Sequence, residues 1–172
     1  MMNSSQSKRL ARLGLLTAAA LILGLFENAF PPLLAFAPGV KLGLANVVSL
    51  IALIISGIGD AYAILLVRCL LLSLFSGNVS SLMYSIPAAI VSLTVMTLLY
   101  VLLFPRLGLV SVSVAGACAF NAVQLLIASI IVKTNLLAIL PIMLLASTLA
   151  GTFTGLVAWC LVKYLPKKVY LE

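Results

Sequence analysis

The feature that most constrains this sequence is a succession of long apolar segments, separated only by short groups of proline, glycine or charged residues. A helical segment of about 20 apolar residues is as long as the hydrocarbon core of a bilayer is thick. Proline, glycine and charge end such segments. The second and third segments are short, so a tilted or re-entrant path is an alternative for them. The predicted spans are residues 13–30, 42–56, 61–76, 85–104, 108–132 and 136–162.

Composition supports an exterior that faces lipid. Of the 172 residues, 65% are hydrophobic and 8% are charged, whereas soluble domains are about half apolar and about a quarter charged. We therefore predict an all-α integral membrane protein with six transmembrane helices. The expected organisation is a cytoplasmic tail over residues 1–12, one transmembrane domain over 13–164 and a second cytoplasmic tail over 165–172.

The distribution of lysine and arginine predicts which side faces the cytoplasm. With six spans, both termini share one side with the turns near residues 57–60 and 105–106. Short cytoplasmic loops carry an excess of basic residues. Both termini are therefore predicted to be cytoplasmic, in a multi-pass protein of the cell membrane, with a bacterial plasma membrane as the expected location. That side holds Lys8, Arg9, Arg12, Arg106, Lys163, Lys167 and Lys168, and the other side holds Lys41 and Lys133.

The inventory of reactive side chains argues against catalysis. The chain has no histidine, and its acidic residues are Glu27, Asp60 and Glu172. With three acidic residues far apart in the sequence, a carboxylate pair or a catalytic triad is hard to assemble. The acidic clusters that hold Mg²⁺ and diphosphate are absent from the sequence. The three cysteines lie in apolar runs without a CxxC spacing, so no metal or cofactor is predicted. The basic residues lie mostly at span ends, which does not favour nucleic-acid binding.

Arg68 is the most informative residue, because it falls inside the predicted third span. With a helix that starts at residue 61, it lies about 10 Å from the inner end. A charge at that depth is costly and usually functional. It forms either a structural ion pair with Glu27 or Asp60, or an anchor for an anionic ligand. Both interpretations stay open.

Other polar residues are placed where they can contribute to the same site. Glu27, near the outer end of the first span, is either interfacial or lines a cavity. Lys41 and Asn46 lie at the start of the second span. Asn121 and Gln124 are three residues apart and share a face of the fifth span. They form either interhelical hydrogen bonds or contacts with a ligand. The candidate substrate-binding residues are Arg68, Glu27, Lys41, Asn46, Asn121 and Gln124.

Pairs of small residues four apart occur in the first and last spans. Gly14 and Ala18 form one pair, and Gly151 and Gly155 form another. Such pairs allow two helices to approach closely. They serve either packing within this bundle or docking of another protein.

The segment Pro38–Asn46, which reads PGVKLGLAN, resembles the Gx transporter family, also named heptaprenyl diphosphate synthase component I. The resemblance extends over nearly the whole chain. It also includes Arg68, the Asn121-x-x-Gln124 element and the pair Gly151 and Gly155.

That family is similar to the substrate-binding S components of energy-coupling factor (ECF) transporters, which are six-helix membrane proteins that capture vitamins or related compounds. The resemblance implies a vitamin-like or anionic small-molecule substrate, an ECF transmembrane coupling subunit and two cytoplasmic ATPases. S components dock through small residues on the first helix, for which Gly14 and Ala18 are the nearest match. Two alternatives stay open: a non-catalytic membrane partner of heptaprenyl diphosphate synthase, and a small secondary transporter that would use Glu27 for ion coupling.

Overall fold

The computed structural model describes residues 4–29, 44–77, 82–104, 106–133 and 135–164, and over these residues it contains helices and no strands. The predicted all-α class is confirmed. The helices are α1 (Ser4–Ala29), α2 (Leu44–Ser56), α3 (Ile58–Ser76), α4 (Leu82–Leu103), α5 (Leu109–Val132) and α6 (Leu140–Tyr164), with the short 3-10 helix η2 (Leu136–Ile139) before α6.

Five of the six helices, all except α2, are long and apolar enough to cross a membrane. The predicted multi-pass fold is therefore confirmed. Helix α2 has 13 residues, which gives a length of about 20 Å against a hydrocarbon core of about 30 Å. The third span, which the sequence predicts to be short as well, has 19 residues and is long enough.

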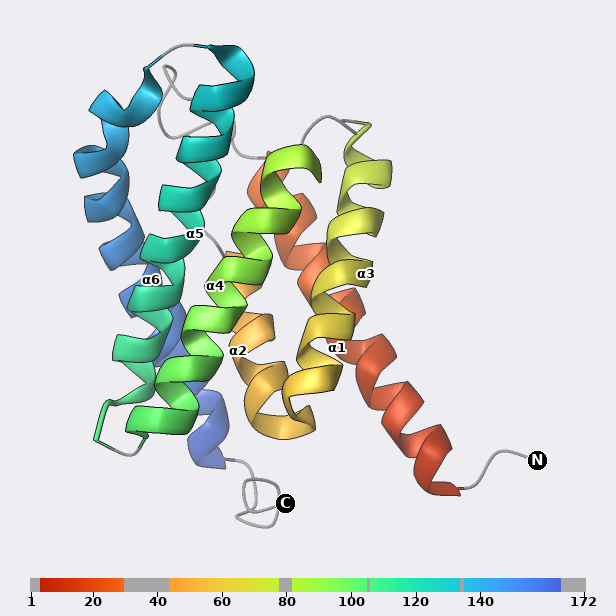
Figure 1. Ribbon diagram of the computed structural model, residues 1–172. Helices are drawn as coiled ribbons and strands as arrows, with labels where there is room; N and C mark the ends of the chain where they lie inside the picture. The colour runs from red at the N-terminus through yellow and green to blue at the C-terminus, as the bar shows by residue number, and fades with distance from the viewer. Residues whose placement is uncertain (1–3, 30–43, 78–81, 105, 134, 165–172) are drawn as a thin grey trace.

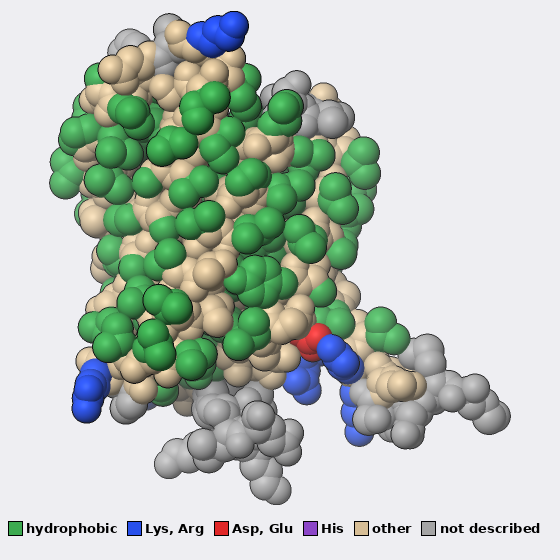
Figure 2. Space-filling model, viewed as in Figure 1, with side chains coloured by type: hydrophobic (Ala, Val, Ile, Leu, Met, Phe, Trp, Pro, Cys, Tyr) green, Lys and Arg blue, Asp and Glu red, His purple; other side chains and the backbone are tan. Residues whose placement is uncertain are grey.

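The helices alternate in direction, so chain ends and turns are sorted between the two ends of the bundle (Figure 1). The start of α1, the α2–α3 turn, the α4–α5 turn and the end of α6 lie together at what we call the terminal end. This is the grouping that six alternating spans predict. Figure 2 shows lysine and arginine gathered at the two ends of the molecule, with a hydrophobic band between them that suits lipid.

Three elements begin earlier than the sequence predicts. Helix α1 starts at Ser4, so it includes residues predicted as tail. Gly57 alone forms the α2–α3 turn, at a φ of 86° that favours glycine, and Asp60 therefore lies in the first turn of α3 rather than in a loop. Helix α4 starts at Leu82 rather than at residue 85, so Pro87 lies inside it.

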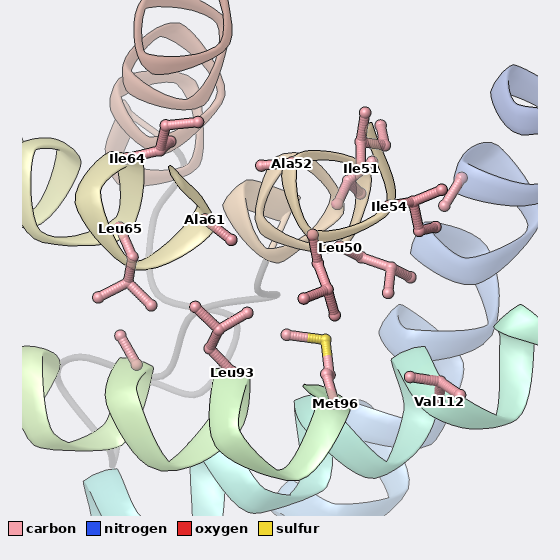
Figure 3. Close-up of a cluster of buried hydrophobic side chains, with 14 of the residues drawn as sticks. Leu50, Ile51, Ala52, Ile54, Ala61, Ile64, Leu65, Leu93, Met96 and Val112 are labelled. Carbon is pink, nitrogen blue, oxygen red and sulfur yellow. The ribbon is translucent and has the colours of Figure 1, made fainter. Parts of the chain in front are cut away.

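Helix α2 is the central helix in the half of the bundle that contains the terminal end. It packs against each of the other five helices, and every side chain from Asn46 to Ile54 is buried. Figure 3 shows its leucine and isoleucine side chains enclosed by residues of α3, α4 and α5. A helix that is apolar on all sides is either enclosed by protein or faces lipid, and α2 is enclosed by protein. The five long helices instead each expose large apolar side chains.

Helices α5 and α6 approach until their backbones touch. A Cβ atom added to Gly151 would lie 2.7 Å from Val114 Cα, and one added to Gly155 would lie 2.7 Å from Val110 Cα. Real Cβ atoms do not come this close to backbone. This pair of small residues therefore serves packing within the bundle.

A buried polar layer at mid-depth

Three buried polar side chains lie at nearly the same depth in the bundle. At 1.5 Å per residue, Arg68 lies about 15 Å along α3 from its start, and Asn46 lies about 15 Å along α2 from its end. The two helices are antiparallel and meet at Gly57, so these side chains are level. Asn121 lies about 18 Å along α5 from its start. Arg68 is deeper than the predicted 10 Å, because α3 begins at Ile58.

Arg68 is a buried cation with hydrogen-bond donors that the described residues leave unused. Its exposed fraction is 4%, and its Nε and Nη1 atoms have no hydrogen-bond partner among the described residues. Nearly all buried polar groups in proteins are paired, and a buried charge is paired most of all. A buried guanidinium with two free nitrogen atoms is therefore a site where an acceptor is expected to bind.

The proposed ion pair between Arg68 and Asp60 does not form, because Arg9 binds Asp60 instead. Arg9 Nε donates to Asp60 Oδ1 at 3.2 Å and to Oδ2 at 3.1 Å, and Arg9 Nη2 also contacts Oδ1. Asp60 lies about 12 Å from Arg68 along α3. Arg12 Nη1 donates to the carbonyl of Ile55 at 3.3 Å. These contacts attach α1 to the α2–α3 turn at the terminal end.

Asn46 adds a second unused donor at the level of Arg68. Its exposed fraction is 8%, and its Nδ2 atom has no hydrogen-bond partner among the described residues. It is the third described residue of α2. The α2–α3 side of this layer therefore presents donors and positive charge.

Asn121 presents the opposite chemistry. Its Nδ2 atom donates to Ser147 Oγ at 2.6 Å, and Ser147 Oγ donates to the carbonyl of Met143, also at 2.6 Å. The hydroxyl has one hydrogen, which the Met143 carbonyl receives, so Ser147 must accept from Asn121. This fixes the orientation of the amide. Asn121 Oδ1, with no partner among the described residues, is a free acceptor.

The remaining candidate residues take different positions. Gln124 is buried, with an exposed fraction of 4%, on the same side of α5 as Asn121, as their spacing predicts. Glu27 is half-buried in the last turn of α1. Lys41 lies outside the described residues, so its assignment stays a prediction. The structure thus places Arg68, Asn46, Asn121 and Gln124 in the bundle interior.

Ser147 is a residue of this layer that sequence reasoning missed. Its exposed fraction is 1%, and it connects α6 to Asn121 on α5. The available signal is its spacing, because Ser147, Gly151 and Gly155 recur every four residues and form one small-residue stripe on α6. The stripe faces α5, which predicts that Ser147 does too.

The pair Gly14 and Ala18 lies on the outer surface of the described structure. Both residues are exposed, and a Cβ atom added to Gly14 would have nothing within 4 Å. This contrasts with Gly151 and Gly155. Packing among the described residues therefore does not account for the small residues on α1.

Comparison with known proteins gives a family match. The model of the family described as heptaprenyl diphosphate synthase component I matches residues 16–161, which is most of the chain, from α1 to α6. No curated protein and no solved structure matches the chain. Among the described residues, no group of three or more His, Cys, Asp or Glu side chains is placed to hold a metal ion.

Proposed function

This chain belongs to the heptaprenyl diphosphate synthase component I family, the Gx transporter family of the sequence resemblance, and on that premise we propose that it is the substrate-binding component of an ECF-type importer. It holds a small anionic or vitamin-like compound inside a helical bundle in the cell membrane. It carries out no reaction itself. A coupling subunit and two cytoplasmic ATPases supply the energy for transport.

The observation that carries this proposal is the buried guanidinium of Arg68 at mid-depth, two of whose nitrogen atoms have no hydrogen-bond partner among the described residues. Placing an arginine near the centre of a membrane helix costs about 2.5–3.5 kcal/mol. Here that cost is not offset by an ion pair with Asp60, which Arg9 binds. An anionic ligand that binds Arg68 through two parallel hydrogen bonds would offset it. The substrate-binding site of a carrier protein is empty during part of the transport cycle, so such a protein can contain an arginine without a bound ligand.

The exposed small residues of α1 support the partner assignment. Gly14 and Ala18 leave a shallow surface on which another helix can pack closely. The sequence also has no Gly-Lys-Ser/Thr phosphate-binding loop, so ATP hydrolysis must come from another chain.

Co-purification with the candidate partners tests this function. The protein is expressed with the coupling subunit and the ATPases of the same cell, isolated in mild detergent and identified with its partners by mass spectrometry. Gly14→Leu combined with Ala18→Leu is expected to abolish the complex, because large side chains block close helix approach. Ala63→Leu, on the exposed side of α3, is the control and is expected to retain it. A complex and an uptake rate that the double variant leaves unchanged would refute docking through α1.

The family description favours a second candidate, a non-catalytic membrane partner of heptaprenyl diphosphate synthase. The same isolation distinguishes the two. Capture of a soluble prenyl diphosphate synthase, with no coupling subunit or ATPase, would support this second function and contradict the first. Capture of neither, together with substrate uptake driven by an ion gradient, would instead support a secondary transporter.

A further inference from the structure

The unpartnered polar atoms of the mid-depth layer fall into two chemically opposite sets. On α2 and α3 they are all donors, namely Arg68 Nε, Arg68 Nη1 and Asn46 Nδ2. On α5 the corresponding atom is an acceptor, Asn121 Oδ1. One kind of ligand group cannot satisfy both sets, because the first needs acceptors and the second needs a donor.

The acceptor character of Asn121 is determined by its neighbours. Ser147 donates its only hydroxyl hydrogen to the Met143 carbonyl, so it can only accept from Asn121. A 180° flip of the Asn121 amide would therefore break its hydrogen bond to Ser147. Asn121 Oδ1 is thus held as an acceptor in a side chain that is 97% buried, since its exposed fraction is 3%. Leaving such a buried acceptor unmatched is unfavourable.

The helices that carry Arg68 and Asn121, α3 and α5, lie on different sides of α2 (Figure 3). Helices α3 and α5 both pack against α2, and Figure 3 shows Ile64 and Leu65 of α3 on one side of it and Val112 of α5 on the other. Packed helix axes lie about 8–10 Å apart. A molecule that reaches both sets is therefore longer than a single phosphate or carboxylate.

From this arrangement we propose that the ligand is an elongated small molecule with two recognition groups. A carboxylate or phosphate binds Arg68 and Asn46, and a separate hydroxyl or N–H group donates to Asn121 Oδ1. The inference rests on the proposed function, because it assumes that a small molecule occupies the bundle interior. It adds the requirement for a donor distinct from the anionic group.

Matched probes that differ by one hydroxyl group test the proposal. The probes are 4-hydroxybenzoate with benzoate, 3-hydroxypropyl phosphate with propyl phosphate, and inorganic phosphate as a bare anion. Their affinities are measured by thermal shift on the purified full chain, on Arg68→Gln and on Asn121→Leu. The controls are Arg106→Gln, at the exposed α4–α5 turn, and Thr152→Val, whose exposed hydroxyl donates to the Thr148 carbonyl of the same helix.

The expected result is a pattern rather than a single loss. Arg68→Gln weakens every anion by about 10- to 100-fold, as expected for a charged hydrogen-bond partner. Asn121→Leu weakens only the hydroxyl-bearing member of a pair, by about 2- to 10-fold, and makes it equal to its partner. Inorganic phosphate is insensitive to Asn121→Leu. The two control variants bind every probe as the native chain does.

Two results would overturn the proposal. The first is that no hydroxyl-bearing probe binds more tightly than its partner at millimolar concentration. The second is that the preference for the hydroxyl persists in Asn121→Leu. Melting temperatures without any probe identify variants that fail to fold, and Arg68→Lys, which keeps the charge, provides a second measurement of the anion-binding end.

The probe experiment and the co-purification experiment can fail independently of each other. If the probes show the expected pattern but no ECF subunit co-purifies, the ligand class stands and the importer function fails. If the ECF complex forms and transports but the probes show no such pattern, the importer stands and the two-group ligand is wrong.

Discussion

Replacing Arg68 by methionine distinguishes a ligand-binding arginine from a structural one without knowledge of the ligand. The two possibilities predict opposite signs. Arg68 is 4% exposed and two of its nitrogen atoms have no described partner. Methionine fills a similar volume with no charge to bury. Replacing buried charge by apolar side chains commonly stabilises a protein by about 1–4 kcal/mol, whereas removing one member of a buried ion pair costs about 3–5 kcal/mol.

We therefore expect Arg68→Met to raise the melting temperature of the ligand-free protein while it abolishes anion binding. At roughly 2–4 °C per kcal/mol for a chain of this size, the shift is several degrees. Unfolding can be followed with a thiol-reactive dye through Cys69, which is buried, in a background with Cys118→Ser and Cys160→Ser. Arg106→Met, at an exposed position, is the control and should leave the melting temperature nearly unchanged.

A fall in the melting temperature of Arg68→Met would refute this reasoning. It would show that the guanidinium has a permanent partner in the protein, and that the layer around it is a structural network. Loss of anion binding without a rise in stability would leave the binding role intact but contradict the estimate of the charge-burial cost.

Two further predictions concern topology and packing. A cysteine at Ser76 should react with an impermeant thiol reagent added outside the cell, and a cysteine at Arg106 should react only from the cytoplasm. This follows because the basic residues concentrate at the terminal end, which is therefore expected to be cytoplasmic. The reverse labelling pattern would contradict this topology. Gly151→Ala should destabilise the protein by about 1–3 kcal/mol, because its Cβ would lie 2.7 Å from Val114 Cα, whereas Gly14→Ala, with open space around it, should be neutral or stabilising. Equal effects of the two alanines would contradict the close α5–α6 contact.

The sequence predicted the helices well where apolar runs end at strong terminators. The ends of α2, α3 and α5 at Ser56, Ser76 and Val132 agree with the predicted span ends. The start of α1 was predicted less well, because hydropathy marks where lipid begins and not where a helix begins. Polar residues such as Gln6, Lys8 and Arg9 are compatible with a helix in water.

The central position of α2 could not be predicted from hydropathy. A helix enclosed by protein and a helix that faces lipid are both apolar on every side, and only the short length of α2 distinguishes it. The bond between Arg9 and Asp60 joins residues 51 positions apart, which no local pattern encodes.

The polar layer was predicted in part. Arg68, Asn121 and Gln124 are conspicuous because such side chains are costly in lipid, so they are expected to turn inward. Ser147 gave no comparable signal, since a serine hydroxyl can bond to its own helix, as this one does to the Met143 carbonyl. Only the partner helix shows that it also orients Asn121.

The shortness of α2 also has a consequence for how the chain enters the membrane. The 13 described residues of α2 do not span the hydrocarbon core, and the next helix carries an arginine that penalises insertion on its own. Gly57 joins the two in a one-residue turn, so they can enter together as a helical hairpin in which Asn46 is level with Arg68. Helices α2 and α3 are therefore expected to insert into the membrane together. A bulky residue at Gly57, where φ is 86°, would impair this insertion and lower the amount of folded protein before any effect on binding could be measured.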